Sequence, residues 1–195
     1  MIMTLLHPED YITTTWSGGT TTQLAIAPKG AIYAERDFLW RLSSATVDLE
    51  ESDFTALPDY RRWISTLRGD MTLTHNGGEA LTLHPYDVHE FEGSDDTHSR
   101  GKCKDFNLML RKGKADGSIR AIRVSGGAFS FRTPTQAHSM TLLYCAEGNA
   151  AVRCGGKLLG ICAGESVLIE DSAGAVATVE SATPAVFMAA QAWEN

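Results

Sequence analysis

Short apolar or alternating runs, separated by Gly, Asn, Asp and Pro, follow one another along most of the chain. From residue 72 onward these runs occupy residues 72–74, 80–83, 119–124, 139–144, 150–153, 166–169, 175–179 and 185–189. Each run has the length of a strand, and no amphipathic helical pattern interrupts the series. Strands that recur every 8 to 12 residues or so, with turn residues between them, are typical of sandwiches and barrels. The pattern therefore predicts an all-β protein.

The pattern of residues 67–91 returns in residues 146–169. Gly69 corresponds to Gly148, the Gly77-Gly78 pair to Gly155-Gly156, and the turn at Pro85 to the turn at Gly164, all at about the same spacing. Both Gly-Gly pairs are typical of tight hairpin turns between strands. The repeat predicts two similar β units in one chain.

The expected junction between the units is the polar, glycine-bearing stretch 112–117, which follows one predicted strand and precedes another. We therefore expect an amino-terminal barrel at residues 1–112 and a carboxy-terminal barrel at residues 118–195, packed together. Polar side chains interrupt the strands of the first unit, whereas residues 150–154 and 185–188 of the second are mainly apolar. These differences predict one working pocket, in the amino-terminal unit, with the other unit as structural support.

Composition limits the classes of function. A chain of 195 residues with 43% apolar content suffices for one large core or two smaller ones. The first residues lack the basic region of a signal peptide, and no run approaches the roughly 18 apolar residues of a membrane span, so we expect a cytoplasmic protein.

The four cysteines form no Cys-x-x-Cys pair, which favours reduced thiols packed in strands. A net charge of −7 without a basic cluster argues against nucleic acid and anionic membranes as partners.

Two predicted strands, residues 40–44 and 105–111, carry polar side chains at alternate positions. If Trp40 and Phe106 mark the packed faces, the opposite faces present Arg41, Ser43, Asp105 and Asn107. An arginine fork can bind a carboxylate through two hydrogen bonds, while an amide and a hydroxyl fix its orientation. The set suits a small polar or anionic metabolite. The alternative is that these positions simply face solvent.

The densest run of hydroxyls and glycines lies at residues 13–22, which predicts either a surface turn or a flexible, donor-rich lip over a pocket. This run begins a series of short blocks at residues 16–24, 37–43, 54 with 57–62, 67–69 and 105–109. In this order the blocks resemble the HutD/Ves family of cupin-like proteins. The resemblance covers residues 12–111, and beyond residue 118 it rests on the repeated β pattern.

The resemblance implies a bicupin fold, with two cupin-like, RmlC-like jelly-roll β-barrels in one chain. It also implies a link to histidine utilisation, in which a regulatory role through binding of a pathway intermediate has been proposed. The ligand-binding positions that it implies are Gly18, Gly19, Thr21 and Gln23 in the Gly-rich loop, Trp40 and Arg41 in a Trp-Arg pair, Arg62, and Asp105 and Asn107 in an Asp-Phe-Asn block. Ser43 joins them by strand alternation. The chain departs from the family where Trp16 replaces Asn, Asp59 replaces Gly and Gln23 replaces Glu, so the contacts of the loop can differ.

A metal site is the competing interpretation, because many cupins bind a metal ion through a His-x-His pair, a Glu and a later His. This chain has no His-x-His, and His75 falls in a predicted turn where solvent exposure is expected. The remaining candidate cluster is His84, His89 and His98 with Glu90. We expect no metal and no other cofactor. No Gly-x-Ser-x-Gly elbow or activated cysteine pattern occurs either.

Three hypotheses follow. The first is a metal-independent, small-molecule-binding bicupin of the HutD/Ves type that binds a carboxylate-bearing intermediate such as formylglutamate, with Arg41 and Arg62 as anion anchors. The second is a metal-free enzyme, an isomerase or hydrolase, with Asp105 as general base and Arg41 as anchor. We favour the first, and so assign no catalytic residue. The third is an interaction protein or homodimer built through exposed strands.

Overall fold

The computed structural model describes every residue from Met1 to Asn195 and divides the chain into two compact units. Unit 1 comprises Met1–Tyr11 and Ala115–Asn195, and unit 2 comprises Ile12–Lys114. The chain passes from unit 2 to unit 1 inside the expected stretch 112–117. The amino-terminal unit was expected to begin at residue 1, but the first eleven residues belong with the carboxy-terminal unit.

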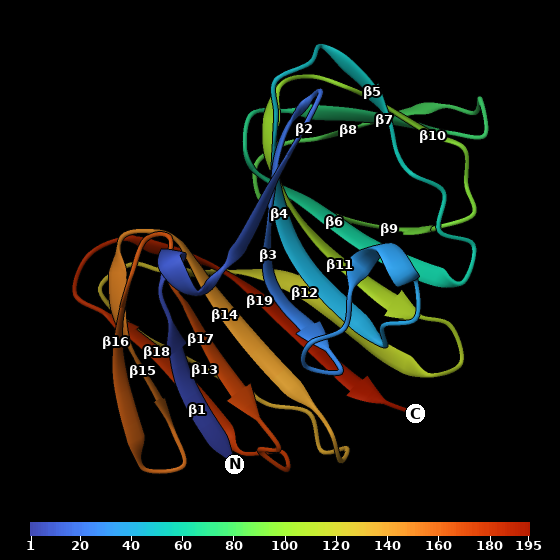
Figure 1. Cartoon of the computed structure of the whole chain (residues 1–195). Coiled ribbons are helices and arrows are strands. Elements are labelled where there is room, and N and C mark those ends of the chain that lie inside the picture. The colour runs from blue at the N-terminus through green and yellow to red at the C-terminus, as the bar shows by residue number, and fades with distance from the viewer. The chain divides into compact units, whose positions relative to one another are not determined.

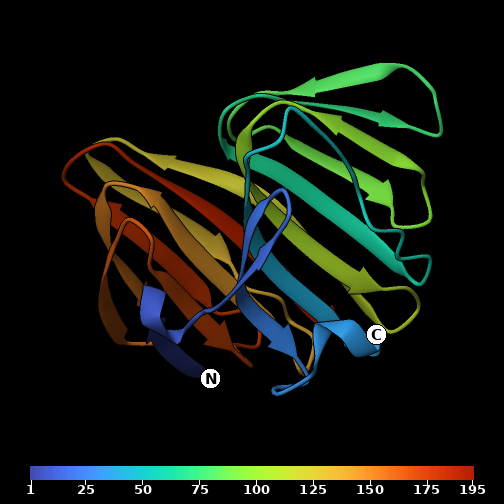
Figure 2. The same ribbon diagram turned by 45° about the horizontal axis from the view of Figure 1, so that its top comes forward.

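Unit 2 is built from two antiparallel sheets (Figure 2). A six-stranded sheet has the order β2-β3-β4-β11-β6-β9, and a four-stranded sheet has the order β5-β10-β7-β8. The strands are β2 (Ile12–Trp16), β3 (Gly19–Ala27), β4 (Trp40–Val47), β5 (Glu51–Asp53), β6 (Tyr60–Arg68), β7 (Met71–His75), β8 (Ala80–Leu83), β9 (Val88–Glu92), β10 (Thr97–Arg100) and β11 (Cys103–Arg111). A short 3-10 helix, η2 (Tyr33–Glu35), lies between β3 and β4.

Unit 1 also consists of two sheets, a five-stranded one with the order β1-β17-β14-β19-β12 and a four-stranded one with the order β13-β18-β15-β16. The elements are β1 (Ile2–Leu6), the 3-10 helix η1 (Pro8–Asp10), β12 (Ala115–Val124), β13 (Gly127–Arg132), β14 (Met140–Glu147), β15 (Asn149–Cys154), β16 (Lys157–Cys162), β17 (Ser166–Glu170), β18 (Val176–Ser181) and β19 (Ala185–Glu194). Figure 1 shows β1, in dark blue, among the orange and brown strands of this unit. It pairs with β17 from Ile2 to Leu6, which explains why the amino terminus belongs here.

The strand pairings occur in the same order in both units, as the sequence repeat predicts. The run β4 to β11 corresponds to β12 to β19, because β11 pairs with β4 and β6 just as β19 pairs with β12 and β14. The predicted hairpins are confirmed, with positive φ at Asn76 and Gly77 between β7 and β8, and at Gly155 and Gly156 between β15 and β16. In neither unit does a strand pairing join the two sheets into a closed barrel.

All ten expected strands are present. The expectation of a surface turn or a flexible lip at residues 13–22 is wrong. They form the hairpin of β2 and β3, in which Thr14 lies opposite Thr21. The β-branched threonines favour the extended conformation. Gly19 has a φ of +147°, and a Cβ at this position would lie 1.9 Å from the carbonyl oxygen of Thr46. The glycine therefore allows β3 to lie close to β4.

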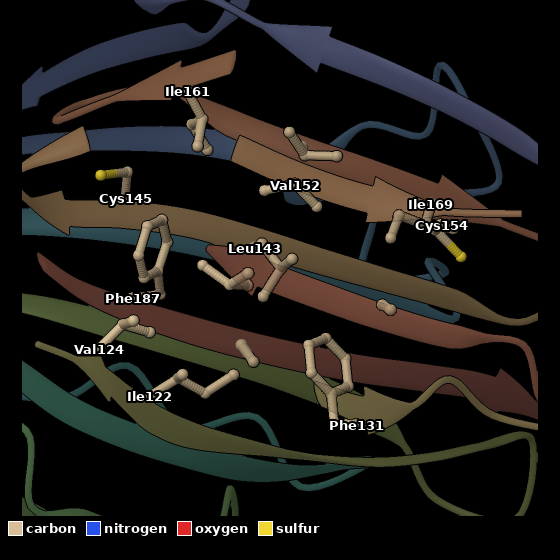
Figure 3. Packing of buried hydrophobic residues seen from close by; sticks show 14 of the residues in the cluster. Ile122, Val124, Phe131, Leu143, Cys145, Val152, Cys154, Ile161, Ile169 and Phe187 are labelled. Atoms are coloured by element: carbon tan, nitrogen blue, oxygen red, sulfur yellow. The ribbon is translucent and has the colours of Figure 1, made fainter. Parts of the chain in front are cut away.

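The core of unit 1 is mainly apolar (Figure 3), although hydroxyl side chains such as Thr141 and Ser166 are also buried in this unit. Leu143 from β14 and Phe187 from β19 pack against Val152 from β15, and all three are fully buried. Cys145 and Cys154 belong to the same cluster, while Cys103 is buried in unit 2 and Cys162 is exposed; all four thiols are free. The expectation of reduced, mainly buried cysteines is confirmed.

The core of unit 2 lies between its sheets and occupies only part of the space. Val47, Ile64 and Phe91 from the six-stranded sheet pack against Met71 and Leu73 from the four-stranded sheet. Elsewhere the same face of the six-stranded sheet carries polar side chains. No helix in the structure has the length and apolar character needed to cross a membrane.

Candidate functional site

Unit 2 encloses a cavity of about 380 Å³. Its floor is the face of the six-stranded sheet that packs on the four-stranded sheet, and its rim comes from β2, β5 and η2. The lining residues are Thr14, Trp16, Thr21, Tyr33, Arg41, Ser43, Ala45, Val47, Ser52, Asp53, Phe54, Thr55, Arg62, Asp105, Asn107 and Met109. Two of them are arginines and none is a histidine or cysteine.

The cavity brings together six of the ten residues that the sequence singled out: Thr21, Arg41, Ser43, Arg62, Asp105 and Asn107. The other four do not line it. Gln23 lies opposite Ser43 in the β3–β4 pairing, and its Oε1 accepts a hydrogen bond from Nε of Arg41 at 2.8 Å. Trp40 is buried on the opposite face of the sheet, where alternation places it. Gly18 and Gly19 shape the β2–β3 turn, and a Cβ on Gly18 would collide with the ring of Trp16.

Strand register places the polar side chains in two neighbouring rows. Ser43 of β4 lies opposite Asn107 of β11. In the next row Met109 of β11 lies opposite Arg41 on one side and opposite Arg62 of β6 on the other. Because adjacent strands are about 4.8 Å apart, the two arginine backbones lie about 10 Å apart across Met109. Both side chains reach the same cavity from opposite sides.

Arg41 is held by neutral groups. Its Nε donates a hydrogen bond to Oε1 of Gln23 at 2.8 Å, and its Nη1 donates to Oγ of Ser43 at 3.2 Å. The guanidinium carbon lies 4.2 Å from the centre of the Tyr33 ring, a cation–π contact. Burial lowers the pKa of Arg41 below its ordinary value. No carboxylate forms an ion pair with this side chain.

The guanidinium group of Arg62 has fewer hydrogen-bond partners than that of Arg41. It is only 5% exposed, and its one hydrogen bond is a long one, 3.5 Å from Nη1 to the carbonyl oxygen of Thr55. The guanidinium carbon lies 4.9 Å and 5.0 Å from the ring centres of Phe54 and Phe91. Nε has no hydrogen-bond partner. Burial lowers the pKa of Arg62 to about 10, because a charged group loses stabilisation when it leaves water.

Asp105 supplies the buried carboxylate of the cavity. Its Oδ1 accepts a hydrogen bond from the backbone N–H of Ala45 at 2.6 Å. Burial raises the pKa of Asp105 to about 6, although the Ala45 hydrogen bond and the charges of Arg62 and Arg41 act in the opposite direction. Two residues along β11, the buried Oδ1 of Asn107 has no partner. Two side chains that line the cavity therefore each contain a buried polar atom without a partner, Nε of Arg62 and Oδ1 of Asn107.

Several lining residues were not predicted from the sequence. Thr14 and Trp16 alternate along β2, so recognising residues 13–22 as a hairpin would have identified them. Tyr33, on η2, and Phe54, directly after β5, contact Arg41 and Arg62 through their rings. Neither lies in a periodic pattern, and only Phe54 belongs to one of the HutD-like blocks, the one that also contains Arg62.

The expected exposure of His75 is wrong. This residue ends β7 and is half-buried, with its Nδ1 2.9 Å from Oγ1 of Thr97. Its Nε2 lies 2.9 Å from Nε2 of His89 on β9. Burial lowers the pKa of both imidazoles, and for His89 the neighbouring His75 adds to the effect. The pair links the two sheets of unit 2 and does not line the cavity.

The alternative histidine cluster is not assembled in the structure. His84 contacts Asp70 at 3.1 Å and His98 contacts Asp53 at 2.7 Å, whereas His89 pairs with His75. The three histidines therefore have separate partners. No group of three or more His, Cys, Asp or Glu side chains is arranged to hold a metal ion.

The arrangement of cavity and strands can now be compared with known proteins. The family model of HutD matches residues 8–187, nearly the whole chain. The chain belongs to the HutD family. No curated protein matches it. Among solved structures, a conserved protein of unknown function, PA5104 from Pseudomonas aeruginosa PAO1, is 25% identical, with a TM-score of 0.85 over 98% of this chain and 99% of that one.

Two further solved structures are similar to this chain in fold. HutD from Pseudomonas fluorescens SBW25, solved in a formate condition, is 24% identical, with a TM-score of 0.75 and full coverage of both chains. YhhW from Escherichia coli is 8% identical, with a TM-score of 0.68 over 97% of each chain. At such low identity the likeness concerns the fold alone, which is all-β with cupin-like neighbours.

The HutD-like blocks of the sequence converge on the six-stranded sheet. They fall on the β2–β3 hairpin, the start of β4, the start of β6 and the middle of β11. These four segments supply most of the polar lining, including both arginines and Asp105. In this member of the HutD family the characteristic motifs and the cavity therefore coincide.

Proposed function

We propose that the cavity of unit 2 binds a small carboxylate-bearing metabolite without a metal ion. The observation that carries the proposal is the pair Arg41 and Arg62, two buried guanidinium groups without a carboxylate partner in ion-pair contact. Burying an unpaired charge is unfavourable, and an anion between the two groups would offset that cost through charge-assisted hydrogen bonds.

The neutral lining groups support an organic ligand. Asn107 presents an unpartnered acceptor, and Ser43 and Thr21 add hydroxyls. Tyr33, Phe54 and Met109 provide apolar surface for a carbon chain. The cavity therefore combines apolar surface with polar groups that could orient a small ligand, although its lining is more polar than that of most small-molecule sites. Two guanidinium groups also make the cavity unfavourable for a cation.

The family adds the biological context of the proposal. We propose a bicupin of the HutD/Ves type, in which two cupin-like units form one cytoplasmic protein that regulates histidine utilisation by binding a pathway intermediate such as formylglutamate. The repeated pairing order supports two related units. The contrast between the apolar core of unit 1 and the polar cavity of unit 2 supports a ligand site in the latter. The homodimer stays a prediction.

Calorimetric titration with formylglutamate, urocanate and histidine tests the proposal. We expect the wild type to bind formylglutamate and Arg62→Ala to bind it at least about tenfold more weakly, because the variant lacks one of the anion anchors. The matched control is Arg120→Ala. The guanidinium of Arg120 also lies over aromatic rings, 4.9 Å from that of Phe131, but in unit 1. Equal affinity in the Arg62 variant and the wild type would contradict the proposal.

One observation favours a second function, an isomerase or hydrolase. Asp105 lines the cavity, and burial raises its pKa to about 6, close to the pH at which a general base is most effective. Arg41 would then anchor the anionic part of the substrate. Asp105→Asn would abolish turnover while leaving binding intact. Conversion of formylglutamate or urocanate by the wild type, followed by chromatography, decides between binding alone and catalysis.

A further inference from the structure

A bound carboxylate would share the cavity with Asp105. This side chain is 6% exposed and lines the same space as Arg41 and Arg62. It forms no ion pair with either arginine, and its hydrogen bond comes from the backbone of Ala45. With Asp105 ionised, the two arginines and this carboxylate leave one net positive charge. With Asp105 protonated, they leave two.

The charges that face Asp105 come from several elements. Arg62 on β6 and Arg41 on β4 favour its ionised form, as does Lys104 beside it on β11. Asp53 at the end of β5 and Tyr33 on η2 also line the cavity. No second carboxylate is as deeply buried in this cavity, because Asp53 is exposed and pairs with His98. Asp105 is therefore the acid that a buried anionic ligand would perturb most.

We propose that the cavity takes up a proton together with a carboxylate ligand, and that Asp105 holds this proton in the complex. The inference rests on the proposed function and specifies the ligand as one whose anionic group approaches Asp105 without offering it a hydrogen-bond donor. Two carboxylates in one poorly solvated site cannot both ionise without a large electrostatic cost. A protonated Asp105 also gains an O–H that can donate to the ligand or to Asn107.

The pH dependence follows from the pKa of about 6 for Asp105 in the free protein. A bound anion raises this pKa further. Ligand affinity is then highest below pH 6 and falls by up to about tenfold per pH unit above it, until the pKa of the complex is reached. A ligand that donates a hydrogen bond to an ionised Asp105 behaves in the opposite way. It lowers the pKa of Asp105 and releases protons on binding.

The experiment is titration calorimetry with formylglutamate, whose carboxyl groups are ionised throughout the range, at pH 5.5, 6.5, 7.5 and 8. Each titration is repeated in two buffers of different ionisation enthalpy, because the difference in heat gives the number of protons taken up. For the wild type we expect uptake that approaches one proton near neutral pH and tighter binding at pH 5.5 than at pH 8. This measurement needs no variant.

The same titrations with the variant Asp105→Asn form the second part of the experiment. Asn keeps an oxygen for the Ala45 N–H but cannot titrate. The variant should bind without proton uptake, with similar affinity to the wild type at pH 5.5 and at least about tenfold tighter binding at pH 8, where the repulsion is removed. Asp59→Asn, at an exposed position outside the cavity, should behave as the wild type does.

The outcomes distinguish failure of proton uptake by Asp105 from failure of carboxylate binding itself. Binding by the wild type without proton uptake, or weaker binding by Asp105→Asn at every pH, would overturn proton coupling and leave the carboxylate site intact. Absence of binding by the wild type at every pH would overturn both. Proton uptake that persists in Asp105→Asn would assign the proton to another group and so contradict the inference.

Discussion

Oε1 of Gln23 on β3 accepts a hydrogen bond from Nε of Arg41 on β4 at 2.8 Å. The contact orients the guanidinium towards the cavity without neutralising it, because an amide carries no charge. A glutamate at this position would instead carry a negative charge next to Arg41, so the charge available to a ligand depends on the amide of Gln23. Gln23→Glu should convert the contact into an ion pair and weaken formylglutamate binding about tenfold or more.

The measurement for Gln23→Glu is calorimetric titration at low ionic strength. Gln191→Glu is the control for the added charge, because Gln191 lies in unit 1, where its Nε2 donates to the carbonyl oxygen of Arg132. Unchanged affinity in the Gln23 variant would show that the charge of Arg41 does not contribute to binding.

Arg62 illustrates a conflict between stability and binding. Its buried guanidinium has one long hydrogen bond and an unpartnered Nε. Replacement of a poorly paired buried charge by an apolar side chain of similar size is often neutral or stabilising. Arg62→Met should therefore leave the free energy of unfolding unchanged or raise it by about 1 kcal/mol, while ligand binding is lost. Urea unfolding gives the stability, with Arg120→Met as control, and a loss of several kcal/mol would be the contrary result.

Asp105 should destabilise the folded protein at neutral and alkaline pH. The pKa of this group rises from 3.8 to about 6 on folding. The folded state therefore binds more protons between these values, and stability falls as pH rises through that window and stays reduced above it. Asp105→Asn removes the penalty and should raise the free energy of unfolding by about 2 kcal/mol at pH 8 and by little at pH 4.

The unfolding series for Asp105→Asn compares urea midpoints at the two pH values with Asp59→Asn as reference. An equal gain at both values would show that the effect comes from packing, and a loss at pH 8 would show that the ionised carboxylate stabilises the fold.

The His75–His89 pair should have the opposite effect on the pH dependence of stability: it favours the folded state at higher pH. Both imidazoles have lowered pKa values in the folded protein, mainly because of burial. Their contribution to stability is therefore present above the ordinary pKa of histidine, about 6.5, and is lost as pH falls below it. His89→Gln should reduce the loss of stability between pH 7.5 and pH 5, measured by thermal unfolding. His84→Gln, at an exposed histidine, should leave the pH dependence as it is in the wild type.

Gly19 should be intolerant of substitution. It has a φ of +147°, and an added Cβ would lie 1.9 Å from the Thr46 carbonyl oxygen. Gly19→Ala must displace β3 from β4 and should cost about 2 kcal/mol or more of folding free energy. Gly160→Ala, where an added Cβ meets nothing within 4 Å, should stay within about 0.5 kcal/mol of the wild type. Equal melting temperatures would contradict the close approach.

Strand alternation predicted the central part of the site from the sequence. Arg41 with Ser43, and Asp105 with Asn107, share a face because side chains alternate along a strand, and strands β4 and β11 are neighbours. The register between these strands, which brings Ser43 opposite Asn107, depends on the whole sheet and has no local signal. The rim residues Thr14 and Trp16 were not predicted for a related reason, because strand pairing has no local signal. The Thr-rich run 13–22 resembles a turn in composition, and only the pairing of β2 with β3 shows that it is a hairpin.

The sequence predicted most of the strands and hairpins, but not which unit the amino-terminal strand joins. Gly-Gly pairs identify hairpins locally because only certain residues adopt positive φ readily. By contrast, the pairing of β1 with β17 joins residues more than 150 positions apart. The half-burial of His75 likewise depends on β9, which supplies its partner.

The discontinuity of unit 1 has a consequence for synthesis on the ribosome. Unit 2 is a single uninterrupted stretch and can form all its pairings once Lys114 has left the exit tunnel. β1 is made first, yet its partner β17 emerges only after most of the chain. β1 therefore stays without its partner strand while unit 2 can already fold, and the order of synthesis allows an intermediate in which unit 2 is complete and β1 is unpaired.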